Sequence, residues 1–143
     1  SINMQRLLTE YTRSGGRLLV SGSYIASDMT SESERNFLNN VLKVDYNGET
    51  PSRNYTNITG MGTSFDIYRT INEDHYAATS PDVLHPVGSA FCALLYGDGR
   101  GASIAYDGRD YKSFVMGFPF ECIKSHSKRN AVMRGILSFL MKN

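Results

Sequence analysis

Apolar residues along the chain recur at two spacings, one typical of helices and one typical of strands. Helical spacing predicts helices around residues 4–11, 37–42 and 127–141. Continuous or alternating apolar runs predict strands at residues 17–21, 64–70, 90–96, 102–106 and 111–117. Helices and strands in this order predict one α/β domain over residues 1–143, in which helices cover a mixed sheet.

The residues between these runs define several boundaries. Gly15 and the glycine after it supply the left-handed stop that ends a helix. Ser31 and Glu34 have the spacing of a capping box before the second helix. The turn-forming segments 97–101 and 107–110 join successive strand runs, so the last three strands are expected to form an antiparallel meander.

Two expectations concern the first strand and the longest loops. The continuous apolar run at residues 17–21 predicts a strand that is covered on both faces. Residues 47–63 are rich in Gly, Asn, Thr and Ser, which predicts a long irregular excursion. Residues 71–86 contain two prolines and few periodic apolar positions, so we expect mostly loop there.

Composition narrows the classes of partner. Fifteen basic and fourteen acidic side chains give a net charge of +1, so the sequence lacks the electrostatic footprint of nucleic-acid binding. The histidines are isolated and the two cysteines lie in apolar stretches, which predicts no metal site, no cofactor and no disulfide framework. No apolar run approaches the roughly 18 residues that a membrane span needs.

Ser23 is the first candidate for chemistry. It follows the strand at residues 17–21, where a strained turn can present a nucleophile. The bulky Ile25, two positions later, is unfavourable for such a turn, and serines in turns commonly hydrogen-bond their own loop. A nucleophilic Ser23 would need a histidine as its base, and His85 and His126 are the alternatives.

Two further candidates are a histidine and a glutamate. His85, with Asp82 three residues earlier, offers a general base and an orienting acid, although loop histidines are commonly solvated. Glu121 follows an apolar strand end and could orient a base or bind a cation. We favour a structural role for Glu121, with backbone amides or Arg129 as its partner.

Tyrosine is the remaining signal in the composition. The chain has nine tyrosines, which suit a surface for sugars or peptides because each offers a stacking face and a polar tip. It has no tryptophan, on which saccharide platforms often depend. Carbohydrate binding therefore stays open without being favoured.

The order of motifs resembles one known superfamily. A Gly-Gly-strand motif at residues 15–23, a capped helix, a meander and the motif at residues 117–121 resemble the C-terminal part of the class I glutamine amidotransferase-like fold. Within it, the chain is most similar to a domain of secreted bacterial proteins called xanthan lyases. The resemblance implies a flavodoxin-like layered fold that lacks its first βα units.

The resemblance also implies which residues stand at the family's catalytic positions. The nucleophilic cysteine would fall on or near Ser23, the histidine on Pro119 and the glutamate on Glu121. Because a thiolate and an imidazole are both missing, glutamine hydrolysis has no chemical basis here.

The resulting expectation is a non-catalytic accessory, interaction or carbohydrate-associated domain of an exported bacterial protein, periplasmic or extracellular. The alternatives are a serine hydrolase that uses Ser23 and a part of a polysaccharide lyase. Because the first βα units are missing, we expect another copy of the chain, or another segment, to cover the sheet.

Overall fold

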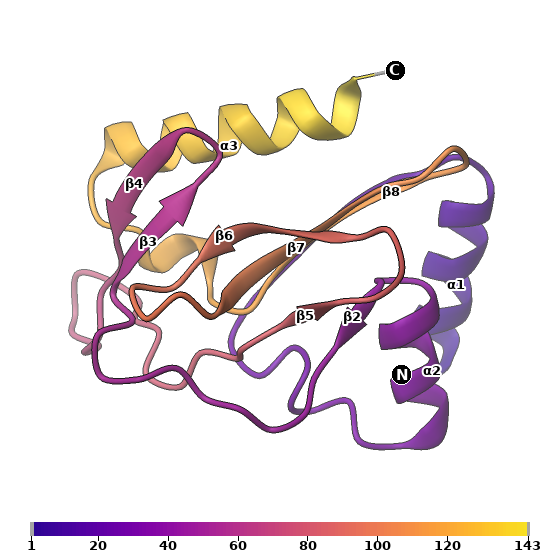
Figure 1. Ribbon diagram of the computed structural model, residues 1–143, viewed down its shortest axis with the longest axis horizontal. Helices are drawn as coiled ribbons and strands as arrows, with labels where there is room; N and C mark the ends of the chain where they lie inside the picture. Colours follow the sequence, from indigo (N-terminus) through magenta and orange to yellow (C-terminus); the bar gives the residue numbers. More distant parts are fainter. Residues whose placement is uncertain (1, 143) are drawn as a thin grey trace.

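A computed structural model describes residues 2–142 as an α/β fold built on one mixed sheet (Figure 1). The helices are α1 (Ile2–Arg13), α2 (Glu32–Asn40) and α3 (His126–Met141), with a short 3₁₀ turn, η1 (Phe120–Cys122). The strands are β1 (Arg17–Ser21), β2 (Val44–Asp45), β3 (Asn57–Gly60), β4 (Thr63–Asp66), β5 (His85–Pro86), β6 (Phe91–Leu95), β7 (Gly101–Asp107) and β8 (Lys112–Met116).

The main sheet has the strand order β1-β8-β7-β6-β3-β4. Strands β6, β7 and β8 form the predicted antiparallel meander, which the structure confirms. Among the described strands of this sheet, β1 and β8 form the one parallel pair, with Leu19 opposite Phe114. A mixed α/β sheet is therefore confirmed. The finer prediction of a flavodoxin-like arrangement stays a prediction.

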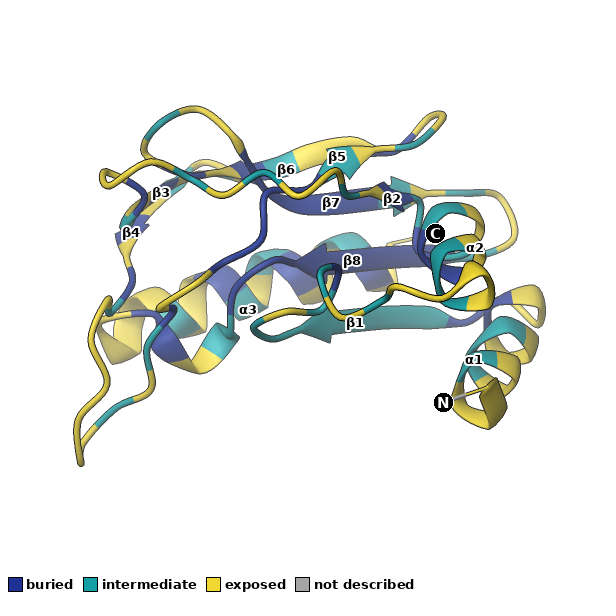
Figure 2. Cartoon of the chain, turned by 90° about the horizontal axis from the view of Figure 1, so that it is seen from below, coloured by how far each residue is buried: buried dark blue, intermediate teal, exposed yellow. Residues whose placement is uncertain are grey.

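Helices cover the sheet on two faces (Figure 1). Helix α3 lies over one face, where Phe114 and Met116 of β8 pack with Ile136 of α3. Helices α1 and α2 lie toward the other, where Val115 of β8 packs with Leu38 of α2. Strands β7 and β8 are the most deeply buried elements (Figure 2), because apolar clusters lie on both of their faces.

The predicted helix boundaries are largely confirmed. The Ser31 hydroxyl accepts the Glu34 backbone N–H, and the Glu34 carboxylate accepts the Ser31 backbone N–H, which completes the capping box. Gly15 has φ 88°, the left-handed conformation expected after α1. Ser125 caps α3 through the backbone N–H of Lys128.

Three sequence expectations need correction. Strand β1 is only half-buried throughout, because it stands at the edge of the sheet and has one neighbour. The excursion at residues 47–63 contains β3, which pairs with β4 and β6. The strand predicted at residues 64–70 ends at Asp66, after which the chain leaves the sheet.

Candidate functional site

The turn after β1 has the backbone strain expected of a nucleophile elbow, but its strained residue is a tyrosine. Tyr24 has φ 62°, a left-handed value that is rare outside glycine. The small residues Gly22 and Ala26 stand two positions before and after it, as such an elbow requires. The left-handed residue of this turn is therefore Tyr24, the neighbour of Ser23, and a nucleophilic role for Ser23 stays a prediction.

The buried carboxylate of Asp82 holds this turn in place. Asp82 is 3% exposed, and its Oδ2 accepts the backbone N–H groups of Ala26 at 3.0 Å and Ser27 at 3.2 Å. The Asp82 backbone N–H donates to the Gly117 carbonyl at 2.9 Å, just beyond β8. Its carbonyl accepts the Tyr96 hydroxyl at 2.7 Å. Asp82 thus ties together the chain segments that follow β1 and β8.

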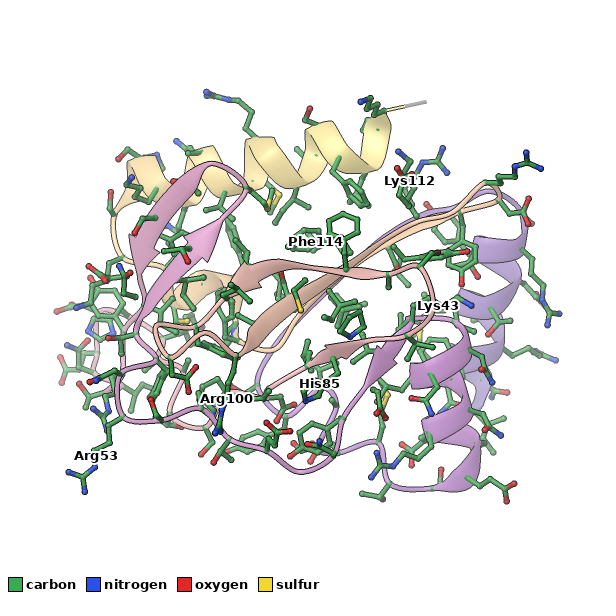
Figure 3. The ribbon with its side chains drawn as sticks, viewed as in Figure 1. Lys43, Arg53, His85, Arg100, Lys112 and Phe114 are labelled. Carbon is green, nitrogen blue, oxygen red and sulfur yellow. The ribbon has the colours of Figure 1, made fainter. Side chains whose placement is uncertain are left out.

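His85 has a different acidic partner from the one expected. Its Nε2 lies 3.1 Å from Glu49 Oε1, while the Asp82 carboxylate is used by backbone amides. Glu49 also accepts the side-chain amide of Asn47 at 2.7 Å, and this hydrogen bond is the main cause that lowers the pKa of Glu49. Figure 3 shows His85 near Arg100, whose guanidinium donates to the Thr50 carbonyl at 2.6 Å. These contacts anchor the loop after β2.

The remaining candidates do not come together as a hydrolase site. Within residues 2–142, no hydrogen bond or ion pair joins Ser23 to His85 or His126. Glu121 lies exposed in η1, and Arg129 instead donates to the Ile123 carbonyl at 2.7 Å. The catalytic roles of Ser23, His85 and Glu121 stay predictions.

Neither cysteine has the environment of a reactive thiolate. Burial raises the pKa of the Cys122 thiol to about 12, and its Sγ donates to the Pro119 carbonyl. Desolvation also raises the pKa of Cys92, although that residue is exposed. Reactive cysteines have lowered pKa values, so both thiols are protonated at neutral pH. Among the described residues, no group of three or more His, Cys, Asp or Glu side chains could hold a metal ion.

An exposed loop between β4 and β5 forms a second candidate site, at the left of Figure 1. Its residues 71–76 line a hollow of about 220 Å³. Tyr76 is 65% exposed, and Asn72, Glu73 and Asp74 place amide and carboxylate groups beside it. An exposed aromatic ring next to planar polar groups offers both a stacking face and hydrogen-bonding partners.

This loop is held in shape by its own contacts. The Asn72 side-chain oxygen accepts the backbone N–H groups of Asp74 at 2.8 Å and His75 at 3.1 Å. The His75 ring stacks on Tyr68 with centroids 3.4 Å apart, and the Lys124 ammonium lies 5.2 Å from the centroid of that tyrosine ring. A surface ordered before binding loses less conformational entropy when a ligand arrives.

Solved structures of other proteins are similar in fold to this chain. No family model matches the chain, and no curated protein matches it. Gan42B, a GH42 β-galactosidase, is similar with a TM-score of 0.66 and 13% identity. The exo-β-1,4-mannosidase Op5Man5 from Opitutaceae bacterium strain TAV5 has a TM-score of 0.62 and 9% identity. A polyextremophilic β-galactosidase from the Antarctic haloarchaeon Halorubrum lacusprofundi has a TM-score of 0.62 and 15% identity.

The similarity covers nearly all of this chain but only a small part of the other proteins. It spans 96%, 97% and 96% of the chain, and 19%, 22% and 20% of the three proteins in the same order. The chain therefore has the length of about a fifth of each. At these identities the comparison concerns the fold alone.

The comparisons overturn the resemblance inferred from the sequence. The similar structures are parts of glycosidases, so the assignment to the class I glutamine amidotransferase-like superfamily, and to xanthan lyase domains within it, is wrong. That assignment depended on a glycine-led strand and a strand-end motif, which are local features that several α/β folds share. This chain is similar in fold to a segment of about a fifth of each of three glycosidases.

Proposed function

We propose that this domain is a non-catalytic, carbohydrate-associated module of a carbohydrate-active protein. The observation that carries the proposal is the fold similarity to segments of two β-galactosidases and a mannosidase. A segment that makes up about a fifth of a larger enzyme suits an accessory role. None of the helices in the described part is long and apolar enough to span a membrane.

Three carboxylates of the described chain are poorly suited to the acid role in glycoside hydrolysis. A glycosidase needs two carboxylic groups across the scissile bond, one of which commonly acts as an acid with a raised pKa. The pKa values of Glu34, Glu49 and Asp98 are all shifted downward. Each is held by local hydrogen bonds from Ser31, Asn47 or Ser52, which favour the charged form.

We assign the glycan contact to the loop at residues 71–76. Tyr76 would stack against the apolar face of a sugar ring, and Asn72, Glu73 and Asp74 would bond its hydroxyl groups. The hollow is small and open, which suits a weak contact with one or two sugar units better than a deep enclosed site.

Binding of short glycans tests this proposal. Isothermal titration calorimetry with β-1,4-linked manno-oligosaccharides and with β-galactosides should detect binding by the unaltered chain. Tyr76→Ala should weaken it at least tenfold, because the stacking face is lost. Tyr24→Ala is the matched control, since Tyr24 is also an exposed tyrosine but lies in the turn after β1. Equal loss in both variants, or no binding, would reject the assigned loop.

A serine hydrolase that uses Ser23 is the second candidate, since the neighbouring Tyr24 has a strained, left-handed backbone. Turnover of a simple activated ester that disappears in Ser23→Ala would establish it. Turnover that disappears in Tyr24→Phe but persists in Ser23→Ala would instead locate the chemistry at the strained residue.

A further inference from the structure

Strand β1 leaves one edge of the main sheet open. It pairs with β8 on one side and stands last in the described strand order. Its sequence, Arg-Leu-Leu-Val-Ser, has no lysine or proline, and its register with β8 has no bulge. Lysine, proline and bulges normally protect an edge strand from pairing with other strands. Because β1 has none of the three, its edge is open to pairing.

The hydrogen bonds at the start of β1 show which backbone groups face outward. The Gly16 carbonyl accepts the Lys112 N–H at 3.3 Å, so Gly16 is directed toward β8. Arg17 is directed the other way, because its N–H and its carbonyl both bond the Tyr11 hydroxyl, at 3.1 and 3.2 Å. Backbone groups alternate between the two edges of a strand, so Leu19 and Ser21 share the outward direction of Arg17.

Tyr11 therefore closes the first position of the edge and leaves two positions open. Its ring lies against Gly16, where an added Cβ would collide with it, so the glycine permits this placement. The outward N–H and carbonyl groups of Leu19 and Ser21 are left for a partner strand.

Apolar side chains border this edge on the face covered by α3. Leu137 and Met141 lie one turn apart on α3 and are 48% and 70% exposed. Gly135 and Phe139 occupy the opposite flank of the helix, against Met61 and Phe91 of the sheet's other half. Because α3 also contacts β1, the exposed flank lies toward the open edge.

The other face of the edge has a similar border from α1. Leu8 packs into the cluster under α1 and α2, while Leu7 and Tyr11 stay 55% and 49% exposed. Leu7 and Tyr11 are one turn apart, and the Tyr11 hydroxyl reaches the outer edge of β1. A strand placed beside β1 would thus have the exposed flank of α3 over one face and Tyr11 of α1 at the position of Arg17.

We propose that β1 of a second copy of this chain occupies this edge, antiparallel to the first. In the register that uses both open positions, Leu19 of each copy exchanges its backbone N–H and carbonyl bonds with Ser21 of the other. The two-fold axis then passes beside Val20, and the same patch serves on both copies.

The composition of the strand suits this pairing. Val20 meets its own copy, and Leu19 lies beside a serine, so no like charges oppose each other. Arg17, the one charged residue of β1, stays outside the pair because Tyr11 occupies its backbone groups. On the α3 face, the two-fold axis brings the Leu137 and Met141 flank of each copy toward its counterpart.

Sedimentation equilibrium of the chain over a wide concentration range tests the pairing. A reversible dimer of the 15.9 kDa chain is expected. Ser21→Pro removes one outward N–H from each copy without touching the bonds to β8, and should raise the dimer dissociation constant roughly tenfold or more. Ile71→Glu places a charge on an exposed apolar residue of the loop between β4 and β5 and should leave the dimer unchanged.

If Ser21→Pro fails to fold, two further measurements test the pairing. Leu137→Glu places a charge on the α3 flank and should also weaken the dimer. Hydrogen exchange at the Leu19 and Ser21 amides should slow as concentration rises. A strict monomer at all concentrations, or a dimer that keeps these amides fast to exchange, would overturn the pairing.

Discussion

At the scale of single residues, Asp82 connects the segments that follow β1 and β8. It is acidic, almost fully buried, and accepts two backbone amides from the turn after β1. The sequence offered this aspartate as a partner for His85, because the two are three residues apart. Side-chain direction in a short irregular segment does not follow from spacing, and the structure turns the carboxylate inward.

Asp82→Ala is expected to lower the free energy of unfolding by about 2–4 kcal/mol, since it leaves the N–H groups of Ala26 and Ser27 without their partner. Urea unfolding followed by circular dichroism measures the change. Asp28→Ala, which truncates an exposed aspartate in the same turn, should have little effect. Equal losses in the two variants would contradict this role for Asp82.

Asp98 is expected to make the free energy of unfolding fall at acid pH. Desolvation raises its pKa, but backbone bonds from Ser52 and Arg100 more than offset this, so the pKa falls below its ordinary value of 3.8. A depressed carboxyl pKa stabilises the fold above the unfolded value, and this stability is lost as pH falls through the folded value.

Asp98→Asn should therefore show a shallower loss of stability below about pH 4 than the unaltered chain, and lower stability at neutral pH. Urea unfolding midpoints measured from neutral to strongly acidic pH provide the test. Asp110→Asn, at an exposed turn position, is the comparison. Identical acid slopes for Asp98→Asn and the unaltered chain would show that Asp98 does not contribute.

At the scale of elements, the close approach of β3 to β6 depends on one glycine. Gly60 has φ 144°, and a Cβ added there would collide with the Ala93 carbonyl oxygen, which belongs to the neighbouring strand. The β3–β4 hairpin joins the sheet through this narrow contact and the pairing of Thr59 with Leu95.

Gly60→Ala should destabilise the fold by roughly 2 kcal/mol or more, because backbone strain and a backbone collision act together. Gly62→Ala is the matched control: it also has a positive φ, of 73°, but an added Cβ meets nothing there. Thermal unfolding of both variants should rank Gly60→Ala well below Gly62→Ala. The reverse order would mean that the loss of stability comes mainly from backbone strain in the turn and not from the collision with β6.

Elements with strong local signals could be predicted from the sequence, and their neighbours in space could not. The capping box at Ser31 and the glycine stop at Gly15 depend on adjacent residues, and both are confirmed. The position of β1 depends on which strand lies beside it, so an apolar run alone did not reveal a half-buried edge. β3 was missed because its four residues lie in a stretch rich in Asn, Thr and Gly.

In the candidate sites, too, local features could be predicted from the sequence and spatial ones could not. Ser23 was a candidate because it follows the first strand, whereas the left-handed backbone of its neighbour Tyr24 is visible only in the structure. The tyrosine content suggested a surface for sugars without locating it. Tyr76 stands out only in the structure, where its exposure and the stacking of His75 on Tyr68 can be seen.

At the scale of the whole molecule, the α/β domain has two exposed surfaces that could bind a partner. One is the open edge of β1, bordered by α1 and α3. The other is the loop at residues 71–76, between β4 and β5, at the left of Figure 1. A module with both could join its own copy through the first and contact glycan through the second.

The central claim is that the loop at residues 71–76 binds glycan. A titration of the ¹⁵N-labelled chain with a β-1,4-linked manno-oligosaccharide or a β-galactoside, followed by ¹H–¹⁵N correlation spectra, tests it most directly. The account predicts chemical-shift changes concentrated at residues 71–76, with the sugar unchanged and the response lost in Tyr76→Ala. Shifts concentrated at residues 22–27, or hydrolysis of the sugar during the titration, would contradict it.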